Sequence, residues 1–191
     1  MKALIVVDLQ NDFCEGGSLG VRGGAETARA VSAFLAEHRA DYDRVVATRD
    51  HHIDPGGHFS DEPDYTDSWP PHCVAGTPGA AFHPEFDASA AEEVFSKGAY
   101  TAAYSGFEGS SEGGEGLEEW LRARGVTEVD VVGIATDHCV RATAEDAAAA
   151  GFATRVLLGL TAGVSRETTD AALRRLAGKG VALEGTPVVA A

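Results

Sequence analysis

The sequence predicts an α/β fold, in which a doubly wound, mostly parallel sheet carries helices on both faces in three layers. Two observations support this prediction: strand-like apolar runs alternate with helix-like periodic segments throughout the chain, and several apolar runs are continuous. Continuous runs are typical of parallel strands covered on both faces, and regular alternation is typical of βαβ units. We find no internal repeat and no linker, so we expect one domain over residues 1–191.

The first half of the chain contains three predicted strands and one predicted helix. Residues 2–7 and 44–48 are apolar runs of strand length, and residues 25–39 carry an apolar stripe at helical spacing. Residues 49–84 are polar, rich in Pro, Gly, His and Asp, and without periodicity. An irregular segment of this length in a compact domain is usually functional. The third strand is predicted at residues 93–97.

The second half continues the alternation, and its helices have recognisable ends. Gly125 and Gly151 follow periodic segments as C-terminal glycines do, and Ser165 is a favourable N-cap. The predicted elements are a helix around Leu117, Trp120 and Leu121, a strand at 129–134, a helix from Val140, a strand at 153–158, a helix at 165–177 and a last strand at 181–184.

Composition and charge exclude several classes of partner. The net charge of −15 would repel nucleic acid and anionic membranes, and no apolar stretch is long enough to span a bilayer. The N-terminus reads as a strand rather than a signal peptide. Cys14, Cys73 and Cys139 cannot all pair, which favours a reducing cytoplasm. We therefore expect a cytoplasmic protein that acts on a small molecule, with the oligomeric state, a homo-oligomer included, left open.

Cys139 is the most informative residue, because it follows the strand at 129–134 directly and precedes the helix from Val140. At a helix N-terminus, free N–H groups and the helix dipole favour thiolate over thiol. The same N–H groups can stabilise an oxyanion. A lone cysteine is more often a small buried hydrophobe, so the neighbouring residues must decide between the two interpretations.

Reactive side chains end the predicted strands, and ligands bind at the carboxyl ends of strands in open parallel sheets. Asp8 ends the first strand, Lys97 ends the third, and Cys139 follows the fourth. We expect Cys139 to attack a carbonyl carbon and form an acyl intermediate. Asp8 would accept the thiol proton and return it to the leaving nitrogen, while Lys97 favours both anions.

A second group of residues suits a metal ion. Asp50, His52, His58 and His72 lie in or beside the long polar segment, and one carboxylate with several imidazoles suits Zn, Fe or Mn. Alternate residues of an extended chain face the same side, so Asp50 and His52 can converge while His51 points away. Histidines in polar loops are often merely solvated, but four suitable residues this close together predict one divalent metal ion.

Five segments together resemble the nicotinamidases (pyrazinamidases) among the isochorismatase-like cysteine hydrolases, which have a Rossmann-like fold. The resemblance covers nearly the whole chain, and the motifs occur in family order. The segments read VVDLQNDF at 6–13, DHH at 50–52, SWPPHC at 68–73, FSKG at 95–98 and GIATDHCV at 133–140.

The resemblance implies hydrolysis of nicotinamide to nicotinate and ammonia in NAD salvage, with pyrazinamide as a side substrate. Asp8, Lys97 and Cys139 match the catalytic triad. The resemblance also implies a cis Ile134–Ala135 bond, with the N–H groups of Ala135 and Cys139 aimed at the oxyanion. The residues that match the ligands of a metal holding the pyridine nitrogen are Asp50, His52, His58 and His72. Those that match the walls around the ring are Phe13, Leu19, Trp69, Tyr104 and His138.

Three alternatives compete with this interpretation. A metal-free amidohydrolase of the same fold would use the triad but would not need the histidines. A vinyl-ether isochorismatase would leave Cys139 without a task. A metal-dependent binding or regulatory protein would not need the intact triad. Metal-dependent turnover of nicotinamide that requires Cys139 would distinguish the nicotinamidase interpretation from all three alternatives.

Overall fold

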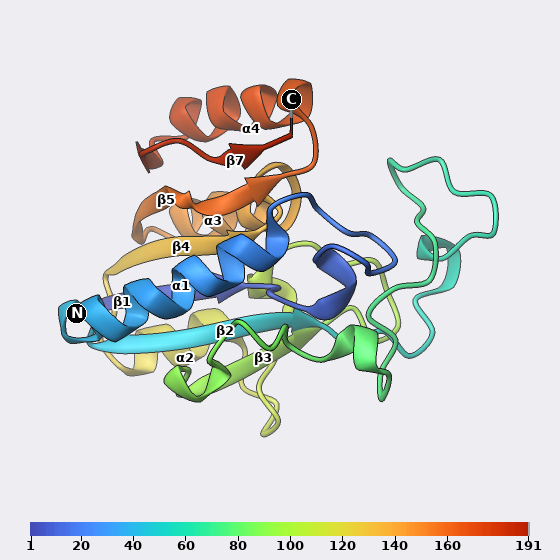
Figure 1. Ribbon diagram of the computed structural model, residues 1–191. Coiled ribbons are helices and arrows are strands. Elements are labelled where there is room, and N and C mark those ends of the chain that lie inside the picture. Colours follow the sequence, from blue (N-terminus) through green and yellow to red (C-terminus); the bar gives the residue numbers. More distant parts are fainter. Residues whose placement is uncertain (191) are drawn as a thin grey trace.

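The computed structural model describes residues 1–190, which form a seven-stranded sheet between layers of helices (Figure 1). The strands are β1 (Lys2–Val7), β2 (Arg44–Asp50), β3 (Glu93–Lys97), β4 (Glu128–Ile134), β5 (Ala153–Gly163), β6 (Ala182–Glu184) and β7 (Val188–Val189). Six of them follow the order β3-β2-β1-β4-β5-β6, and β7 pairs with β5. Each of these pairings is parallel, which confirms the predicted doubly wound sheet.

Helices cover both faces of this sheet. They are α1 (Gly24–His38), α2 (Leu117–Ala123), α3 (Arg141–Ala149) and α4 (Arg166–Gly178). The apolar side of α1 packs on one face, whereas α2, α3 and α4 contribute to the core on the other. Ser165 caps α4 as predicted, because its side chain accepts a hydrogen bond from the N–H of Thr168.

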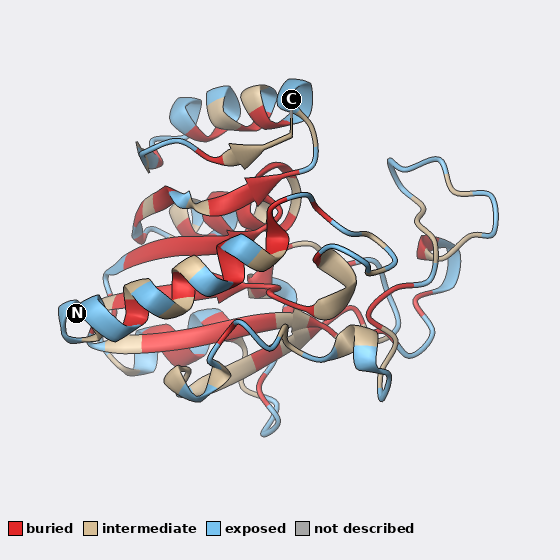
Figure 2. Ribbon diagram, viewed as in Figure 1, coloured by how far each residue is buried: buried red, intermediate tan, exposed pale blue. Residues whose placement is uncertain are grey.

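Strand β1 shows why the apolar runs predicted buried strands. Its side chains alternate between faces: Leu4 and Val6 pack on the side of α1, and Ile5 and Val7 pack on the side of α2 and α3. All four are fully buried. Figure 2 shows the same burial along the central strands, which are red over most of their length. Both faces of the sheet therefore exclude water, as continuous apolar strands require.

β2 ends at Asp50, two residues beyond its predicted end, and the largest differences from the predicted elements are in two other strands. β5 continues to Gly163, five residues beyond the predicted end, after an irregularity in its register with β4 between Val131 and Gly133. The strand β7 was not predicted; it is only two residues long, which is too short for a periodic pattern.

Residues 49 and 50 of the predicted polar segment are the end of β2, and the rest of it lies beyond the carboxyl ends of the strands, at the right of Figure 1. It contains two 3₁₀ turns, Gly56–His58 and Pro78–Ala80, and isolated bridges join His52 to Val74 and Phe59 to Trp69. The segment is thus irregular, but bridges between its own residues hold it together.

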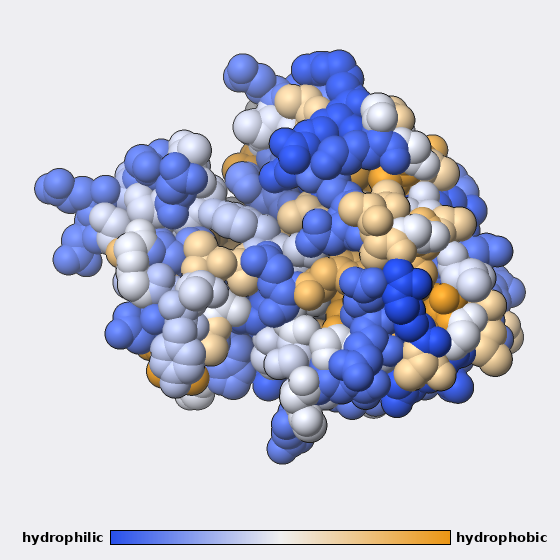
Figure 3. Space-filling model, turned by 180° about the vertical axis from the view of Figure 1, so that it is seen from behind, coloured by the Kyte–Doolittle hydropathy of each residue, from blue (hydrophilic) through white to orange (hydrophobic). Residues whose placement is uncertain are grey.

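Exposed large apolar side chains are few in the described part of the chain: Met1, Ile53, Tyr65, Tyr100 and Val164. Figure 3 shows a largely hydrophilic surface with small apolar areas on the face turned away in Figure 1. Among residues 1–190, no helix has the length and apolar character needed to cross a bilayer.

Candidate active site

The three residues predicted to act on a carbonyl meet at the carboxyl edge of the sheet. Nζ of Lys97 lies 2.8 Å from Oδ2 of Asp8 and 3.9 Å from Sγ of Cys139. The chain turns at Asp8, whose φ of 48° lies in the left-handed region, and Lys97 is the last residue of β3. All three side chains are buried. The predicted convergence of these strand ends is therefore present.

Two further contacts hold this group in place. Lys97 also donates a hydrogen bond to Oδ1 of Asp50, and Thr48 donates from Oγ1 to Oδ1 of Asp8 at 2.8 Å. Asp8 thus has one partner on each carboxylate oxygen. Thr48 was not predicted, because an interior threonine of an apolar strand gives no sign in the sequence that its hydroxyl faces a carboxylate.

The charge states of Lys97 and Asp8 follow from their burial, from their contact with each other and from the nearby Asp50. Burial alone would lower the pKa of Lys97, but Asp50 and Asp8 outweigh burial and hold it well above its usual value. Burial raises the pKa of Asp8, and Asp50 adds to the rise, although Lys97 and Thr48 oppose it. Lys97 is therefore an ammonium, and Asp8 is a more basic carboxylate than an exposed aspartate.

The expected thiolate at Cys139 is not supported. Burial raises the pKa of the Cys139 thiol well above its usual value; Lys97 opposes the rise, while Asp8 and Asp50 add to it. Cys139 also lies inside a π-helical turn, Thr136–Val140, that precedes α3, rather than at a simple strand-to-helix junction. Removal from water outweighs the favourable local dipole, so the nucleophile starts as a thiol that needs a base.

The backbone before Cys139 has the form that the resemblance implied. The Ile134–Ala135 peptide bond is cis. The carbonyl oxygen of Ala135 accepts hydrogen bonds from the N–H groups of His138 and Val140, each at 3.1 Å. Ala135 and Cys139 both line the same cavity. The assignment of their N–H groups to an oxyanion stays a prediction.

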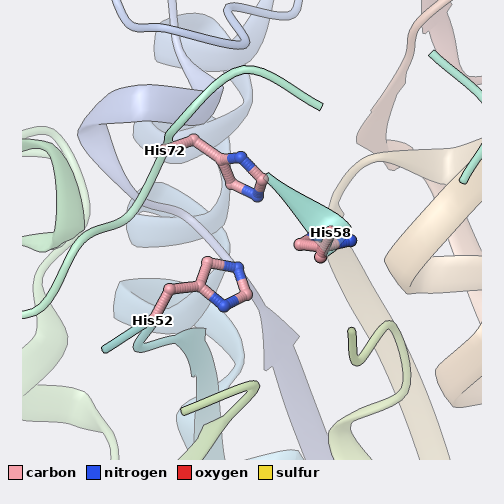
Figure 4. A group of neighbouring side chains, drawn as sticks. All are labelled: His52, His58 and His72. Carbon is pink, nitrogen blue, oxygen red and sulfur yellow. The ribbon is translucent and has the colours of Figure 1, made fainter. Parts of the chain in front are cut away.

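Three histidines form a cluster beside the triad. The ligand atoms of His52, His58 and His72 lie within 4.8 Å of one another, and the rings face a common space (Figure 4). Nδ1 of His52 donates to the carbonyl oxygen of Gly98 at 2.6 Å, and Nδ1 of His72 donates to that of Pro70 at 2.8 Å. These bonds leave both Nε2 lone pairs directed into the cluster, as metal-binding histidines require.

The cluster has the features of a site for one divalent metal ion. Within residues 1–190, Nε2 of His52 and Nδ1 of His58 are buried and have no hydrogen-bond partner. Burial, together with the nearby His72 and His52, lowers the pKa of His58 to about 4, so its ring is neutral near pH 7. Unpaired nitrogen atoms of neutral imidazoles suit Zn, Fe or Mn.

Asp50 lies between the histidine cluster and Lys97. Its Oδ2 is 3.3 Å from Nε2 of His52 and 3.7 Å from Nε2 of His72. Burial would raise its pKa, but Lys97, His52 and His72 outweigh burial and hold the pKa well below its usual range. Asp50 is thus a carboxylate in reach of the cluster. His51 lines a different surface hollow, as the alternation of side chains predicted.

A cavity of about 300 Å³ connects the two groups and is small enough for a single-ring ligand. Trp69 donates from Nε1 to the hydroxyl of Tyr104 at 3.1 Å across two loops. All five residues predicted to surround a ring line this cavity: Phe13, Leu19, Trp69, Tyr104 and His138. Sequence reasoning missed other lining residues, among them Val21, Tyr65, Ala103, Ile134 and Val164.

Comparison with known proteins agrees with this geometry. The family model for the isochorismatase domain matches residues 2–187. The nicotinamidase/pyrazinamidase of Mycobacterium tuberculosis is 70% identical over 176 residues, which are 92% of this chain and 94% of that protein.

Two solved structures are also similar to this chain. The structure of the pyrazinamidase of Pyrococcus horikoshii in complex with zinc is 36% identical with a TM-score of 0.81, over 95% of this chain and 97% of that one. A structure from L. infantum in complex with nicotinate is 32% identical with a TM-score of 0.83, over 100% of this chain and 96% of that one.

Proposed function

The chain belongs to the isochorismatase domain family, and on that premise we propose that it is a nicotinamidase that also acts on pyrazinamide. It is a metal-dependent cysteine amidohydrolase that converts nicotinamide to nicotinate and ammonia. The observation that carries the proposal is one small cavity lined by Cys139 and by two members of the histidine cluster, His58 and His72. A metal-free amidohydrolase would have no use for two buried imidazole nitrogens without partners.

Acylation begins with the buried thiol. Sγ of Cys139 attacks the amide carbonyl carbon while Asp8 accepts the thiol proton, for which its raised pKa suits it. The carbonyl oxygen becomes an oxyanion that would face the N–H groups of Ala135 and Cys139. The C–N bond then breaks as Asp8 returns the proton to nitrogen, which leaves ammonia and a thioester.

Deacylation reverses the same proton transfers. Asp8 takes a proton from water, and the hydroxyl attacks the thioester carbon. The C–S bond breaks, Sγ recovers the proton, and the carboxylic acid leaves and ionises to nicotinate. The Lys97 ammonium, which lies 2.8 Å from Asp8, would offset the negative charge that Asp8 carries in this buried site.

The metal-binding residues are proposed to be Asp50, His52, His58 and His72. A bound divalent ion supplies a Lewis acid for the heterocyclic nitrogen of the substrate. The aromatic walls, Phe13, Trp69 and Tyr104 among them, would fix the plane of the ring, so that the carboxamide is presented to Cys139 in one orientation.

The test is release of ammonia from nicotinamide by the purified protein as isolated, after chelation, and after addition of Zn, Mn or Fe(II). We expect activity to disappear on chelation and to return with at least one metal. Benzamide, which lacks the ring nitrogen, should be turned over far more slowly by the metal-loaded enzyme. Absence of nicotinamide turnover with every metal would refute the proposal.

The setting of this activity is also part of the proposal. Cys14, Cys73 and Cys139 are all free thiols, which fits a reducing cytoplasm. The partner is a small neutral amide rather than nucleic acid or a membrane, which the acidic surface would repel. We assign the activity to the single domain expected over residues 1–191, whether alone or as a homo-oligomer.

A further inference from the structure

We propose that Gln10 is a positioning residue of the active site, which fixes Asp50 between Lys97 and the histidine cluster. The inference rests on the proposed function only for its activity measurement. Gln10 touches neither the cavity nor any reacting atom, so its effect would be exerted through the backbone groups that it holds, those of Asp50 and Ala80.

The side chain of Gln10 is fully buried and makes three hydrogen bonds to the backbone of two residues. Its Nε2 donates to the carbonyl oxygen of Asp50 at 2.8 Å and to that of Ala80 at 2.9 Å. Its Oε1 accepts from the N–H of Asp50 at 2.9 Å. A carboxamide that both donates to and accepts from one residue holds that residue's peptide groups in a defined plane.

The reason for this arrangement lies in the end of β1. The ladder between β1 and β2 stops at the pair Val7 and Thr48, and the chain then turns away at Asp8. Asp50 is two residues farther along β2, where no strand backbone remains on that side. The carboxamide of Gln10 replaces the missing peptide group, so the ladder continues through a side chain.

The orientation of Asp50 matters because both of its oxygens have tasks. Oδ1 contacts Lys97, and Oδ2 lies within 3.3 Å of Nε2 of His52. A small rotation about the Asp50 backbone would move both oxygens at once. The hydrogen bond from Gln10 to the carbonyl oxygen of Ala80 ties this strand end to the loop that follows His72, so one side chain joins two segments that carry proposed metal ligands.

The test compares Gln10→Glu and Gln10→Met with Asn11→Asp. Glutamate keeps the shape of the glutamine side chain but replaces the Nε2 donor with a carboxylate oxygen. Methionine removes all polar atoms of the side chain. Asn11 provides a matched control, because its Nδ2 donates to the carbonyl oxygen of Pro78 in the same loop at 2.8 Å without touching Asp50. Zinc affinity is measured by equilibrium dialysis without substrate, and kcat, KM and Tm are measured on the same preparations.

Loss of a residue that orients a metal ligand costs about 10–100-fold in metal affinity or activity. We expect a loss of about that size in zinc affinity for both Gln10 variants, together with a lower kcat at saturating zinc. Asn11→Asp should change each value less than about threefold, consistent with a polar change away from the site.

Unchanged zinc affinity and kcat, with only a lower Tm, would overturn the proposal, because Gln10 would then serve stability alone. Failure of both Gln10 variants to fold would overturn it for the same reason. If the wild-type protein releases no ammonia from nicotinamide, the proposed function fails, but the zinc affinities still decide the role of Gln10.

Discussion

Asp50 and Lys97 are in direct contact, so one carboxylate is shared between the histidine cluster and the lysine beside the nucleophile. The two residues are also partners in the register of β2 and β3. The triad and the metal site are therefore not independent modules, since a change at Asp50 alters the charge around Lys97 and the donor set of the cluster together.

Replacement of the nucleophile should abolish turnover without unfolding the protein. For Cys139→Ala we expect kcat to fall about a thousandfold or more, since no other group in the cavity can form the acyl intermediate. Ammonia release under saturating nicotinamide measures the effect. Cys14→Ala is the control, because Cys14 is an equally buried thiol that packs in the core near α1. Near-normal turnover by Cys139→Ala would refute the thioester mechanism.

Removal of one histidine of the cluster should separate metal binding from thiol chemistry. For His58→Ala we expect about tenfold or greater loss of metal affinity and a higher KM for nicotinamide. Cys139 should still react with an alkylating reagent, because His58 does not contact it. Bound metal is measured by elemental analysis after dialysis.

His51→Ala is the matched control for that variant. His51 precedes a proposed ligand in sequence, but it lines a separate surface hollow with Arg49 and Ser96. Its removal should leave metal content and KM unchanged. If His58→Ala retains its full metal content, His58 is not a ligand.

The central fold was predictable because burial on both faces leaves a strong apolar pattern. Strands such as β1 and β4 carry that pattern over their full length. β7 could not be predicted, since two residues show no period. The far end of β5 was missed because Gly159 interrupts the apolar run, whereas the structure continues the strand past a shift in register.

The site was predictable where it depends on strand ends, and less so where it depends on side-chain geometry. The convergence of Asp8, Lys97 and Cys139 follows from the rule that parallel strands end at a common edge. The contact between Asp50 and Lys97 depends on the register of β2 and β3, which the sequence does not reveal. The thiolate prediction failed because it weighed the local dipole without the burial of Cys139.

Gly98 should be required for the orientation of His52. A Cβ atom added at Gly98 would lie 2.6 Å from Cε1 of His52 and would displace the ring from its bond to the Gly98 carbonyl. For Gly98→Ala we expect about tenfold or greater loss of zinc affinity, measured by dialysis. Gly114→Ala is the control for backbone strain, because Gly114 also has a positive φ, of 86°, but has nothing within 4 Å of the added atom. Equal zinc affinities in the two variants would contradict this reasoning.

Asp130 should stabilise the fold near the amino ends of the strands, at the end of the sheet opposite the active site. It is buried in β4 and accepts hydrogen bonds from Tyr42 at 2.6 Å and from Arg155 at 2.7 and 3.0 Å, with Lys2 at 2.9 Å. For Asp130→Asn we expect a loss of about 3 kcal/mol in the free energy of unfolding, since a buried ionic group loses its charge. Asp43→Asn, which alters an exposed carboxylate bonded to the Lys2 backbone, should cost about 1 kcal/mol or less.

The effect of Asp130 should depend on pH in a defined direction. Burial would raise its pKa, but Arg155, Tyr42 and Lys2 outweigh burial and hold it below the ordinary value of 3.8. Above that value the carboxylate is ionised in both states, and its stabilisation is complete. As the pH falls below 3.8, the unfolded chain binds the proton more readily than the native state, so the stabilisation declines. Urea unfolding should therefore show a smaller difference between wild type and Asp130→Asn at about pH 3 than at about pH 6. An equal difference at both pH values would show that Asp130 acts through packing rather than through its charge.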